Sequence, residues 1–389
     1  MFNIKTYNTI AAQGLGCFDP EQYCVGPDVS SPHAYILRSH KLHDEPVPDT
    51  LLAVARAGAG YNNIPVDAFS HRGIVVFNTP GANANAVKEL VLAGLILGSR
   101  DVYGGMRFVQ TLNEMNDPSE LSKRLEKEKK RFAGSEISGK TLGVIGLGAI
   151  GSMVANMGVD LNMRVLGFDP ALSVEAAWRL SSRVERMDSV GALVQEVDYL
   201  TVHVPANEHT HHLLDGSVLE KVKPGLRLLN FAREQVVDSK AVLAALDSGR
   251  VARFVSDFPR PEFFGRDDTL LLPHIGASTA EAEENCAVMA AEQLKDFLVN
   301  GNIINSVNFP RTRMARNGGY RITFCNDNVP RILSSVLNVF SDRDINVIDL
   351  VNKSRGDMAY NIVDLETRPE ARALEEVSAV EGVTQLRLL

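Results

Sequence analysis

A glycine-rich segment near the middle of the chain has the spacing of a dinucleotide-binding loop. Gly146, Gly148 and Gly151 form a GxGxxG pattern directly after the apolar run Thr141–Ile145. The first glycine allows a tight turn, and the second lets backbone N–H groups approach a pyrophosphate. A helix that begins there adds partial positive charge. Glycines are common in turns, so only a strand before the pattern and a helix after it make the pattern informative.

Asp169 narrows the choice of nucleotide. It follows the next apolar run, Arg164–Phe168, and stands 18 residues after Gly151. A carboxylate there can accept hydrogen bonds from the ribose hydroxyls and would repel a 2′-phosphate. The spacing therefore predicts NAD rather than NADP as the cofactor. The alternative is a glycine-rich turn that binds no ligand.

Three polar residues further along the chain could carry acid–base and anchoring chemistry. Arg233, Glu262 and His274 each lie just past the end of an expected strand, where ligands of open parallel sheets bind. Oxidation of a secondary alcohol releases a proton, which a histidine oriented by a carboxylate can accept. An arginine fork suits a substrate carboxylate. Singly, the histidine could be structural and the arginine a surface ion-pair partner, but together they indicate a dehydrogenase site.

The elements that position these residues follow from the alternation of apolar runs and turns. Between residues 138 and 275, strands alternate with helices, which predicts βαβ units and a parallel sheet. Residues 1–99 show the same rhythm and end in an apolar helix at Val87–Leu97. A long helix is expected at Thr279–Asn300, ended by Gly301. The charged run Glu120–Arg131 is expected to be a solvated helix or a linker.

We therefore predict an α/β protein with two Rossmann-like doubly wound parallel-sheet domains and a C-terminal ferredoxin-like α+β domain. The substrate-binding domain is expected to be discontinuous, formed by residues 1–98 and 276–310. It would flank a nucleotide-binding domain at residues 99–275. After the basic linker Arg311–Gly319, residues 320–389 show the strand, helix, strand, strand, helix, strand order of the third domain.

Composition limits the classes of function. The formal charge of −8 argues against a broad nucleic-acid surface, and no apolar stretch approaches the ~20 residues that span a bilayer. The N-terminal residues lack the pattern of a secretory signal. The four cysteines are scattered, with no spacing typical of a metal site, so we expect a cytoplasmic protein with reduced thiols and no bound metal. They are Cys17, Cys24, Cys286 and Cys325.

The order of the glycine motif, Asp169, Arg233, Glu262 and His274 resembles that of the D-2-hydroxyacid dehydrogenase family. The resemblance covers nearly the whole chain. It includes the segments Arg38–Ser39, Arg56–Gly60, Asn78–Pro80, Phe132–Glu136, Thr201–Pro205, Pro273–Thr279 and Ser306–Pro310.

The resemblance implies a role for each matching residue. Arg233, Glu262 and His274 would be the catalytic set. The implied cofactor contacts are Gly146, Gly148, Ala149, Ile150, Gly151, Asp169, His203, Val204, Pro205, Phe231, Ala232, Asp257, Gly276 and Ala277. The implied substrate contacts are Arg38, Ser39, Arg56, Asn83, Arg233 and His274.

The resemblance also implies a substrate and an assembly. The two arginines in the early loops suit an acid that carries a phosphate, and the matching members oxidise 3-phosphoglycerate, the first step of serine biosynthesis. Family members form dimers or tetramers. The alternatives are a dehydrogenase of another D-2-hydroxy acid, such as glycerate or lactate, and an NAD-sensing interaction module.

Departures from the family pattern concern two loops and the last domain. Glu234 follows Arg233 where glycine is frequent, and Phe263 follows Glu262 where proline is frequent, which changes loop shape. Residues 320–389 resemble an ACT domain, whose serine-binding members have glycines where Arg331 and Asp344 stand here. The segment Asn326–Pro330 is expected to open the first helix of this domain, and Asn328 within it is retained. The resemblance leaves both serine regulation and a purely oligomerising role open.

Overall fold

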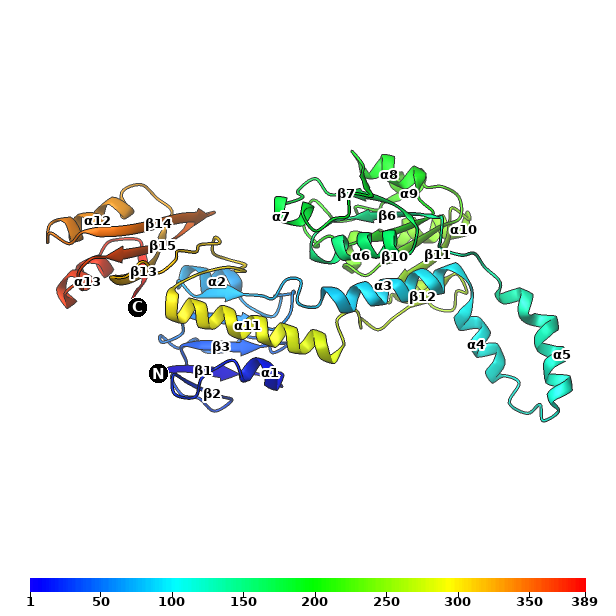
Figure 1. Ribbon diagram of the computed structural model, residues 1–389, viewed down its shortest axis with the longest axis horizontal. Coiled ribbons are helices and arrows are strands. Elements are labelled where there is room, and N and C mark those ends of the chain that lie inside the picture. Colours follow the sequence, from blue (N-terminus) through cyan, green and yellow to red (C-terminus); the bar gives the residue numbers. More distant parts are fainter. The chain divides into compact units, whose positions relative to one another are not determined.

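The structure, a computed structural model, describes residues 1–389 with the exception of the Glu175 side chain. The chain divides into two compact units, each made of its own internal contacts. The first combines residues 1–83 with 280–389, and the second is residues 84–279 (Figure 1). Both predicted parallel-sheet domains and the C-terminal domain are present, which confirms the predicted fold class.

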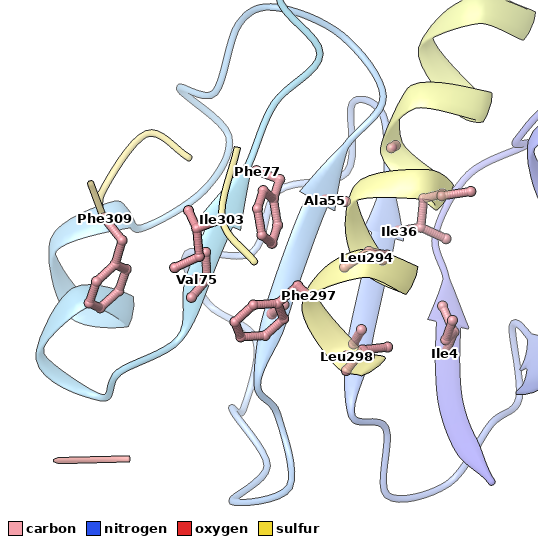
Figure 2. Close-up of a cluster of buried hydrophobic side chains, with 14 of the residues drawn as sticks. Ile4, Ile36, Ala55, Val75, Phe77, Leu294, Phe297, Leu298, Ile303 and Phe309 are labelled. Carbon is pink, nitrogen blue, oxygen red and sulfur yellow. The ribbon is translucent and has the colours of Figure 1, made fainter. Parts of the chain in front are cut away.

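The first unit contains a five-stranded parallel sheet with the order β2-β1-β3-β4-β5. Its elements are β1 Phe2–Thr6, α1 Ala12–Leu15, β2 Tyr23–Gly26, β3 Ala34–Leu37, β4 Ala53–Arg56, α2 Val66–His71, β5 Val75–Phe77 and α11 Ala280–Asn300. The long helix α11 packs its apolar face on this sheet. Figure 2 shows Leu294, Phe297 and Leu298 of α11 against Ile36 and Ala55 of the strands. Burial of this face fixes the helix that follows the predicted active-site loop.

The C-terminal part of the first unit is a four-stranded antiparallel sheet with two helices. Its elements are β13 Tyr320–Asp327, α12 Ile332–Ser341, β14 Val347–Arg355, β15 Met358–Leu365, α13 Ala371–Ser378 and β16 Val383–Leu388. The strand order β14-β15-β13-β16 is that of a ferredoxin-like fold. Val336 and Phe340 of α12 and Val377 of α13 form a core with one face of the sheet.

The other face of this sheet packs against the five-stranded part of the same unit. The Tyr360 hydroxyl donates to the Gly301 carbonyl at 2.6 Å, and Arg387 donates to the carbonyls of Phe297 and Leu298 at the end of α11. Arg321 is fully buried in a two-point ion pair with Asp364, at 2.7 and 2.8 Å. The hydrogen bonds of Tyr360 and Arg387 thus attach the C-terminal sheet to the end of α11.

The start of the C-terminal helix differs from the sequence prediction. Asn326 and Asp327 extend β13, and the helix begins only at Ile332. Arg331 at its N-cap has φ +80°, and Asp344 has φ +52°. Both positions, which the resemblance assigns to glycine, keep the left-handed backbone that glycine adopts most easily. The difference from the family pattern is therefore the added side chain at each position, on a turn with the same left-handed backbone.

The second unit is built on a seven-stranded parallel sheet with the order β12-β11-β10-β9-β6-β7-β8. Its strands are β6 Thr141–Ile145, β7 Arg164–Phe168, β8 Val184–Arg186, β9 Tyr199–Val202, β10 Leu226–Asn230, β11 Val251–Ser256 and β12 Thr269–Leu271. The strand order reverses between β6 and β9, as in a doubly wound fold. Such a reversal opens a crevice at the carboxyl ends of the strands.

Helices cover both faces of this sheet. The helices of this unit are α3 Ala84–Ser99, α4 Val102–Gln110, α5 Pro118–Glu128, α6 Ala149–Asp160, α7 Val174–Ala177, α8 Val190–Glu196, α9 Gly216–Leu219 and α10 Ser239–Asp247, with the 3₁₀ turns η1 Lys129–Phe132, η2 Glu234–Val236 and η3 Pro261–Phe263. Of these, α4 and α5 pack with η1 and extend away from the sheet (Figure 1). The charged run predicted as a solvated helix or linker forms α5 and η1, which bury no residue. Among the described residues, no helix is both long and apolar enough to span a bilayer.

Helix α3 belongs by its contacts to the second unit, whereas the sequence analysis assigned residues 84–98 to the substrate-binding domain. The boundaries observed are at residues 83/84 and 279/280, in place of the predicted 98/99 and 275/276. Gly94 on α3 allows the close approach, because a Cβ there would lie only 3.0 Å from the Phe231 ring, whereas a Cβ on Gly98 would make an ordinary contact with Val255 at 3.6 Å. These contacts with β10, β11 and the loop after β10 depend on tertiary packing.

Candidate active site

The glycine motif forms the turn between β6 and α6 in the second unit. Gly146 has φ +86°, and a Cβ there would lie 2.6 Å from the His203 carbonyl. A Cβ on Gly151 would lie 1.8 Å from the Gly146 carbonyl. Gly148, the N-cap of α6, is different, because a Cβ on it would meet no atom within 4 Å. Two glycines thus close the turn, and the third leaves open space at the helix N-terminus.

Asp169 fastens this turn to the end of β7. Its Oδ2 atom accepts the N–H of Leu147, inside the glycine motif, at 2.8 Å. Its Oδ1 atom accepts the N–H of Ala171 at 2.9 Å. Each oxygen keeps a lone pair for a ligand. The carboxylate that the sequence assigned to the ribose therefore also holds the turn that would receive the pyrophosphate.

His203 closes the neighbouring side of the turn, directly after β9. Its N–H donates to the Ile145 carbonyl at 2.7 Å, and its Nε2 atom lies 3.0 Å from the Thr201 hydroxyl. Burial of the ring lowers the His203 pKa to about 3, so the imidazole is neutral near pH 7. The Nδ1 atom is enclosed without a partner among the described residues. Val204 and Pro205 follow on the same segment.

These residues fit a bound dinucleotide. The N-terminus of the twelve-residue helix α6 has no side-chain cap, so its first N–H groups are available to a pyrophosphate. Ala149 and Ile150 form its first turn, above the open space at Gly148. The Asp169 carboxylate lies beside that turn. Phe231, by contrast, is a core residue with 5% exposure that packs on α3, so its side chain is not available to a cofactor.

The loop that carries Arg233 is fixed by Asn230, the last residue of β10, which the sequence analysis did not single out. The buried Asn230 side chain donates to the Arg233 carbonyl at 2.9 Å and accepts the Ala232 N–H at 3.1 Å. The Arg233 guanidinium is exposed and donates to the Ala232 carbonyl at 2.6 Å. The sequence feature that could have identified Asn230 is a polar residue at the end of a strand, directly before a loop with a candidate functional residue.

Glu262 lies on η3, between a buried anchor and an arginine. Phe263 is 2% exposed and packs on Phe254 of β11 with ring centroids 5.0 Å apart, which explains how an aromatic residue replaces the frequent proline. The Glu262 Oε1 atom lies 2.7 Å from Nε of Arg260. The pKa of Glu262 is lowered, first by its own backbone N–H and then by Arg260 and the Ser239 hydroxyl.

The loop that carries His274 is held by Asp257, at the end of β11. The two oxygens of the buried Asp257 carboxylate accept the N–H groups of Ile275 and Gly276, at 2.8 and 2.7 Å. His274 itself is exposed with φ +57°, and its ring lies 4.9 Å from that of Phe258. Asp257, expected as a cofactor contact, thus positions the histidine loop. Ala277 follows Gly276 on this loop.

The structure gathers the predicted catalytic loops, but it does not pair Glu262 with His274. Among the described side chains, the polar partners of Glu262 are Arg260 and Ser239, and no hydrogen bond joins its carboxylate to the imidazole. The loops themselves follow β10, β11 and β12, which are neighbours in one parallel sheet. Their carboxyl ends lie at the same edge as the glycine turn.

Four of the predicted substrate residues, Arg38, Ser39, Arg56 and Asn83, lie in the first unit, and the other two, Arg233 and His274, lie in the second. Arg38 forms an ion pair with Glu283 of α11 at 2.6 Å, and Arg56 Nε donates to the Arg38 carbonyl at 3.0 Å. The Ser39 N–H donates to the side chain of Asn8 at 3.0 Å. The Oδ1 atom of Asn83 is enclosed without a partner among the described residues. Asn8 and Glu283 were missed, because neither stands near Arg38 in the sequence.

Comparison with known proteins shows to which family the chain belongs. Residues 106–276 match the model of the "D-isomer specific 2-hydroxyacid dehydrogenase, NAD binding domain". The chain is 30% identical over 394 residues to the D-3-phosphoglycerate dehydrogenase of Escherichia coli, an alignment that covers 96% of this chain and 90% of the relative. The chain belongs to the D-2-hydroxyacid dehydrogenase family. Its cofactor is NAD, as Asp169 predicted.

Two further similarities set the extent of the match. The chain is 29% identical over 344 residues to the D-3-phosphoglycerate dehydrogenase of Methanocaldococcus jannaschii, and the match spans 61% of that longer relative and 86% of this chain. The fold is similar to that of NAD⁺-bound 3-phosphoglycerate dehydrogenase of Entamoeba histolytica, with a TM-score of 0.61 and 23% identity over 79% of this chain and 98% of that one.

Proposed function

We propose that this family member catalyses the NAD-dependent oxidation of 3-phospho-D-glycerate to 3-phosphohydroxypyruvate, the first step of serine biosynthesis. The observation that carries the proposal is the shared edge of the seven-stranded sheet. The glycine turn follows β6, Asp169 follows β7, and the loops of Arg233 and His274 follow β10 and β12. The names of the relatives from E. coli and M. jannaschii support this substrate.

The residues of the second unit supply the proton and anion chemistry. His274 accepts the proton of the substrate hydroxyl as the C–O bond becomes a carbonyl. Arg233 holds the substrate carboxylate, and Asn230 and Asp257 keep the two loops in place. NAD⁺, which the glycine turn and Asp169 would hold, would supply the hydride acceptor for the same carbon. Glu262, beside Arg260 on the neighbouring loop, supplies negative charge that favours the protonated imidazole.

The residues of the first unit suit the rest of the substrate. Arg38 and Arg56 provide the two cations that a phosphorylated acid requires, and the Asn83 amide adds a polar group. A dehydrogenase of D-glycerate or D-lactate would not need both arginines. An NAD-sensing module could keep the same loops without turnover.

An NADH-forming assay tests this proposal directly. Purified chain with NAD⁺ would be given 3-phospho-D-glycerate, D-glycerate and D-lactate in parallel, and the reverse reaction would be followed with 3-phosphohydroxypyruvate and NADH. We expect the highest kcat/KM with the phosphorylated acid. Equal or higher kcat/KM with D-glycerate or D-lactate would contradict the substrate, and no turnover with any acid would favour the sensing module.

We further propose that copies of the chain associate into a dimer or tetramer in the cytoplasm. Helix α4 buries no residue and exposes Tyr103, Met106 and Val109, at 53%, 64% and 49%. These residues are spaced to share one face of a helix, and such apolar faces mark association surfaces. The four free cysteines suit a reducing compartment. Sedimentation of the wild type and of Met106→Glu measures the association.

For the C-terminal domain we propose an oligomerising role rather than serine inhibition. Arg331 and Asp344 put side chains at left-handed positions where serine-inhibited relatives have glycine, while Asn328 donates to the Gly356 carbonyl at 3.0 Å. Calorimetry with L-serine is the test. Tight binding of L-serine would contradict the proposal.

A further inference from the structure

Glu234 and Arg260 form an ionic cluster with Glu262 beside the catalytic loops. The Arg260 Nη1 atom contacts the Glu234 carboxylate, and its Nε atom lies 2.7 Å from Glu262. Nε is enclosed, and the second contact lacks the angle of a hydrogen bond, so it is an ion pair without directional bonding. One guanidinium therefore bridges two carboxylates that come from different loops.

The segment that carries Arg260 contacts the neighbouring catalytic loops. Arg260 lies on the segment from Asp257 to Glu262, which follows β11. The first residues of this segment contact the His274 loop. Asp257 binds the N–H groups after His274, and the Phe258 ring contacts the imidazole. At its other end the segment reaches Glu234, the neighbour of Arg233. Arg260 thus joins the loops of Arg233 and Glu262, and the segment that carries it contacts the His274 loop through Asp257 and Phe258.

We propose that Arg260, paired with Glu234, is a positioning residue that holds the Glu262 carboxylate and sets the charge around His274. The inference rests on the proposed function. It also accounts for Glu234, which replaces the glycine frequent in the family: the extra carboxylate has an arginine as its partner. The cluster carries two negative charges and one positive charge, so its net charge is −1.

Other charged groups around the cluster are already engaged. The Asp257 carboxylate is occupied by two backbone N–H groups, and Asp238 at the start of α10 accepts those of Lys240 and Ala241. The Ser239 hydroxyl, also on α10, helps to lower the pKa of Glu262 and carries no charge. The Arg233 side chain donates to its own loop. Replacement of Arg260 or Glu234 therefore changes the charge of the cluster without removing a backbone contact.

Charge-neutral variants of the two residues have opposite expected effects. Arg260→Gln makes the cluster more negative by one charge, which favours protonated His274. Oxidation requires the unprotonated imidazole, so the acid limb of the kcat/KM profile shifts to higher pH, on the order of half a pH unit. Glu234→Gln makes the cluster less negative and shifts that limb to lower pH. Arg260→Lys keeps the charge and restores the position of the limb, but it loses the two-point geometry and leaves kcat lowered severalfold.

Arg266 provides a matched control. It also bridges two carboxylates, Asp247 at 2.9 Å and Asp268 at 2.8 Å, and none of its contacts reaches Glu234, Glu262 or His274. Arg266→Gln removes the same charge from a similar network six residues after Arg260. We expect no shift of the pH profile for this variant. All of these side chains are partly exposed, so the folds of the variants should be maintained.

A second measurement tests the effect of the cluster on His274 without relying on the proposed reaction. Diethyl pyrocarbonate modifies unprotonated histidine, and peptide mass spectrometry follows His274 alone as the pH is varied. The midpoint should rise in Arg260→Gln, fall in Glu234→Gln and stay unchanged in Arg266→Gln. Shifts of the same sign in the first two, or none, would overturn the inference. If the two variants gave opposite shifts but the protein had no turnover, the proposed function would be refuted and the inference about the cluster would stand.

Discussion

The guanidinium of Arg38 lies 2.6 Å from the carboxylate of Glu283. The first belongs to a loop after β3, and the second stands near the start of helix α11, so two segments distant in sequence form this pair. Both side chains are about two-fifths exposed, at 40% and 44%. A substrate anion that binds at the Nη1 atom of Arg38 therefore competes with an internal carboxylate.

Glu283→Gln should lower the KM for the phosphorylated acid without changing kcat. An exposed ion pair contributes about 1 kcal/mol or less, so the decrease is about fivefold or less. Steady-state kinetics measures it. Glu284→Gln is the control, because the Glu284 carboxylate bonds to Gln13 instead. An unchanged or raised KM would show that Glu283 does not compete with the substrate.

His274→Asn should reduce kcat by about 10²- to 10⁴-fold while the Kd for NAD stays within about twofold. Asparagine suits the test better than alanine, because His274 has φ +57° and asparagine adopts that backbone more readily. Calorimetry gives the Kd, and stopped-time assays give kcat. His211→Asn, an exposed histidine stacked on His212, serves as the control. Retained activity would remove His274 from proton transfer.

Gly148→Ala and Gly151→Ala should separate binding from folding. The Cβ of Gly148→Ala meets no protein atom within 4 Å, so its Tm should match the wild type. The same methyl group enters the space above the α6 N-terminus and should weaken NAD binding about tenfold or more. The Cβ of Gly151→Ala lies 1.8 Å from a carbonyl oxygen, so its Tm should fall. Wild-type NAD affinity in Gly148→Ala would contradict the proposed cofactor position.

Asp169→Asn should narrow the preference for NAD over NADP. It removes the charge that repels a 2′-phosphate and weakens the contacts to Leu147 and Ala171, so NAD affinity should fall about tenfold. Binding of both dinucleotides is measured in parallel. Asp188→Asn, an exposed residue after β8, makes the same charge change away from the turn. An unchanged ratio of affinities would exclude the electrostatic explanation.

Burial of His203 predicts a dependence of stability on pH. Its pKa in the folded chain is lowered to about 3, whereas an unfolded histidine titrates near 6.5. Below about pH 6.5 the unfolded chain binds a proton that the folded chain does not. As the pH is lowered from about 6.5 to about 3, the free energy of unfolding therefore decreases by at most about 1.4 kcal/mol per pH unit. Denaturant titrations at several pH values measure this slope. His203→Gln should have a smaller slope, and an equal slope would locate the effect elsewhere.

The sequence determined the elements and their order, because local patterns report local structure. Thr141–Ile145 and Arg164–Phe168 are strands with the predicted bounds, and α11 ends at Asn300, before Gly301 with φ +72°. GxGxxG and Asp169 named the cofactor because their spacing reflects one βαβ unit. The helix expected to open at Asn326–Pro330 begins later, because Asn326 and Asp327 pair with β15 and extend β13.

The tertiary structure alone decided which side chains meet. Asn230 beneath Arg233, Asp257 beneath the His274 loop and Glu283 against Arg38 each depend on chain segments brought together by sheet order or helix packing. The attachment of the C-terminal sheet to α11 through Tyr360 and Arg387 is of the same kind. Sequence patterns fix which face of an element is apolar, but they do not specify the partner of a polar side chain. That choice depends on geometry across the fold. The family pattern indicated His274 as the partner of Glu262, whereas in the structure its carboxylate lies against Arg260, two residues away in sequence.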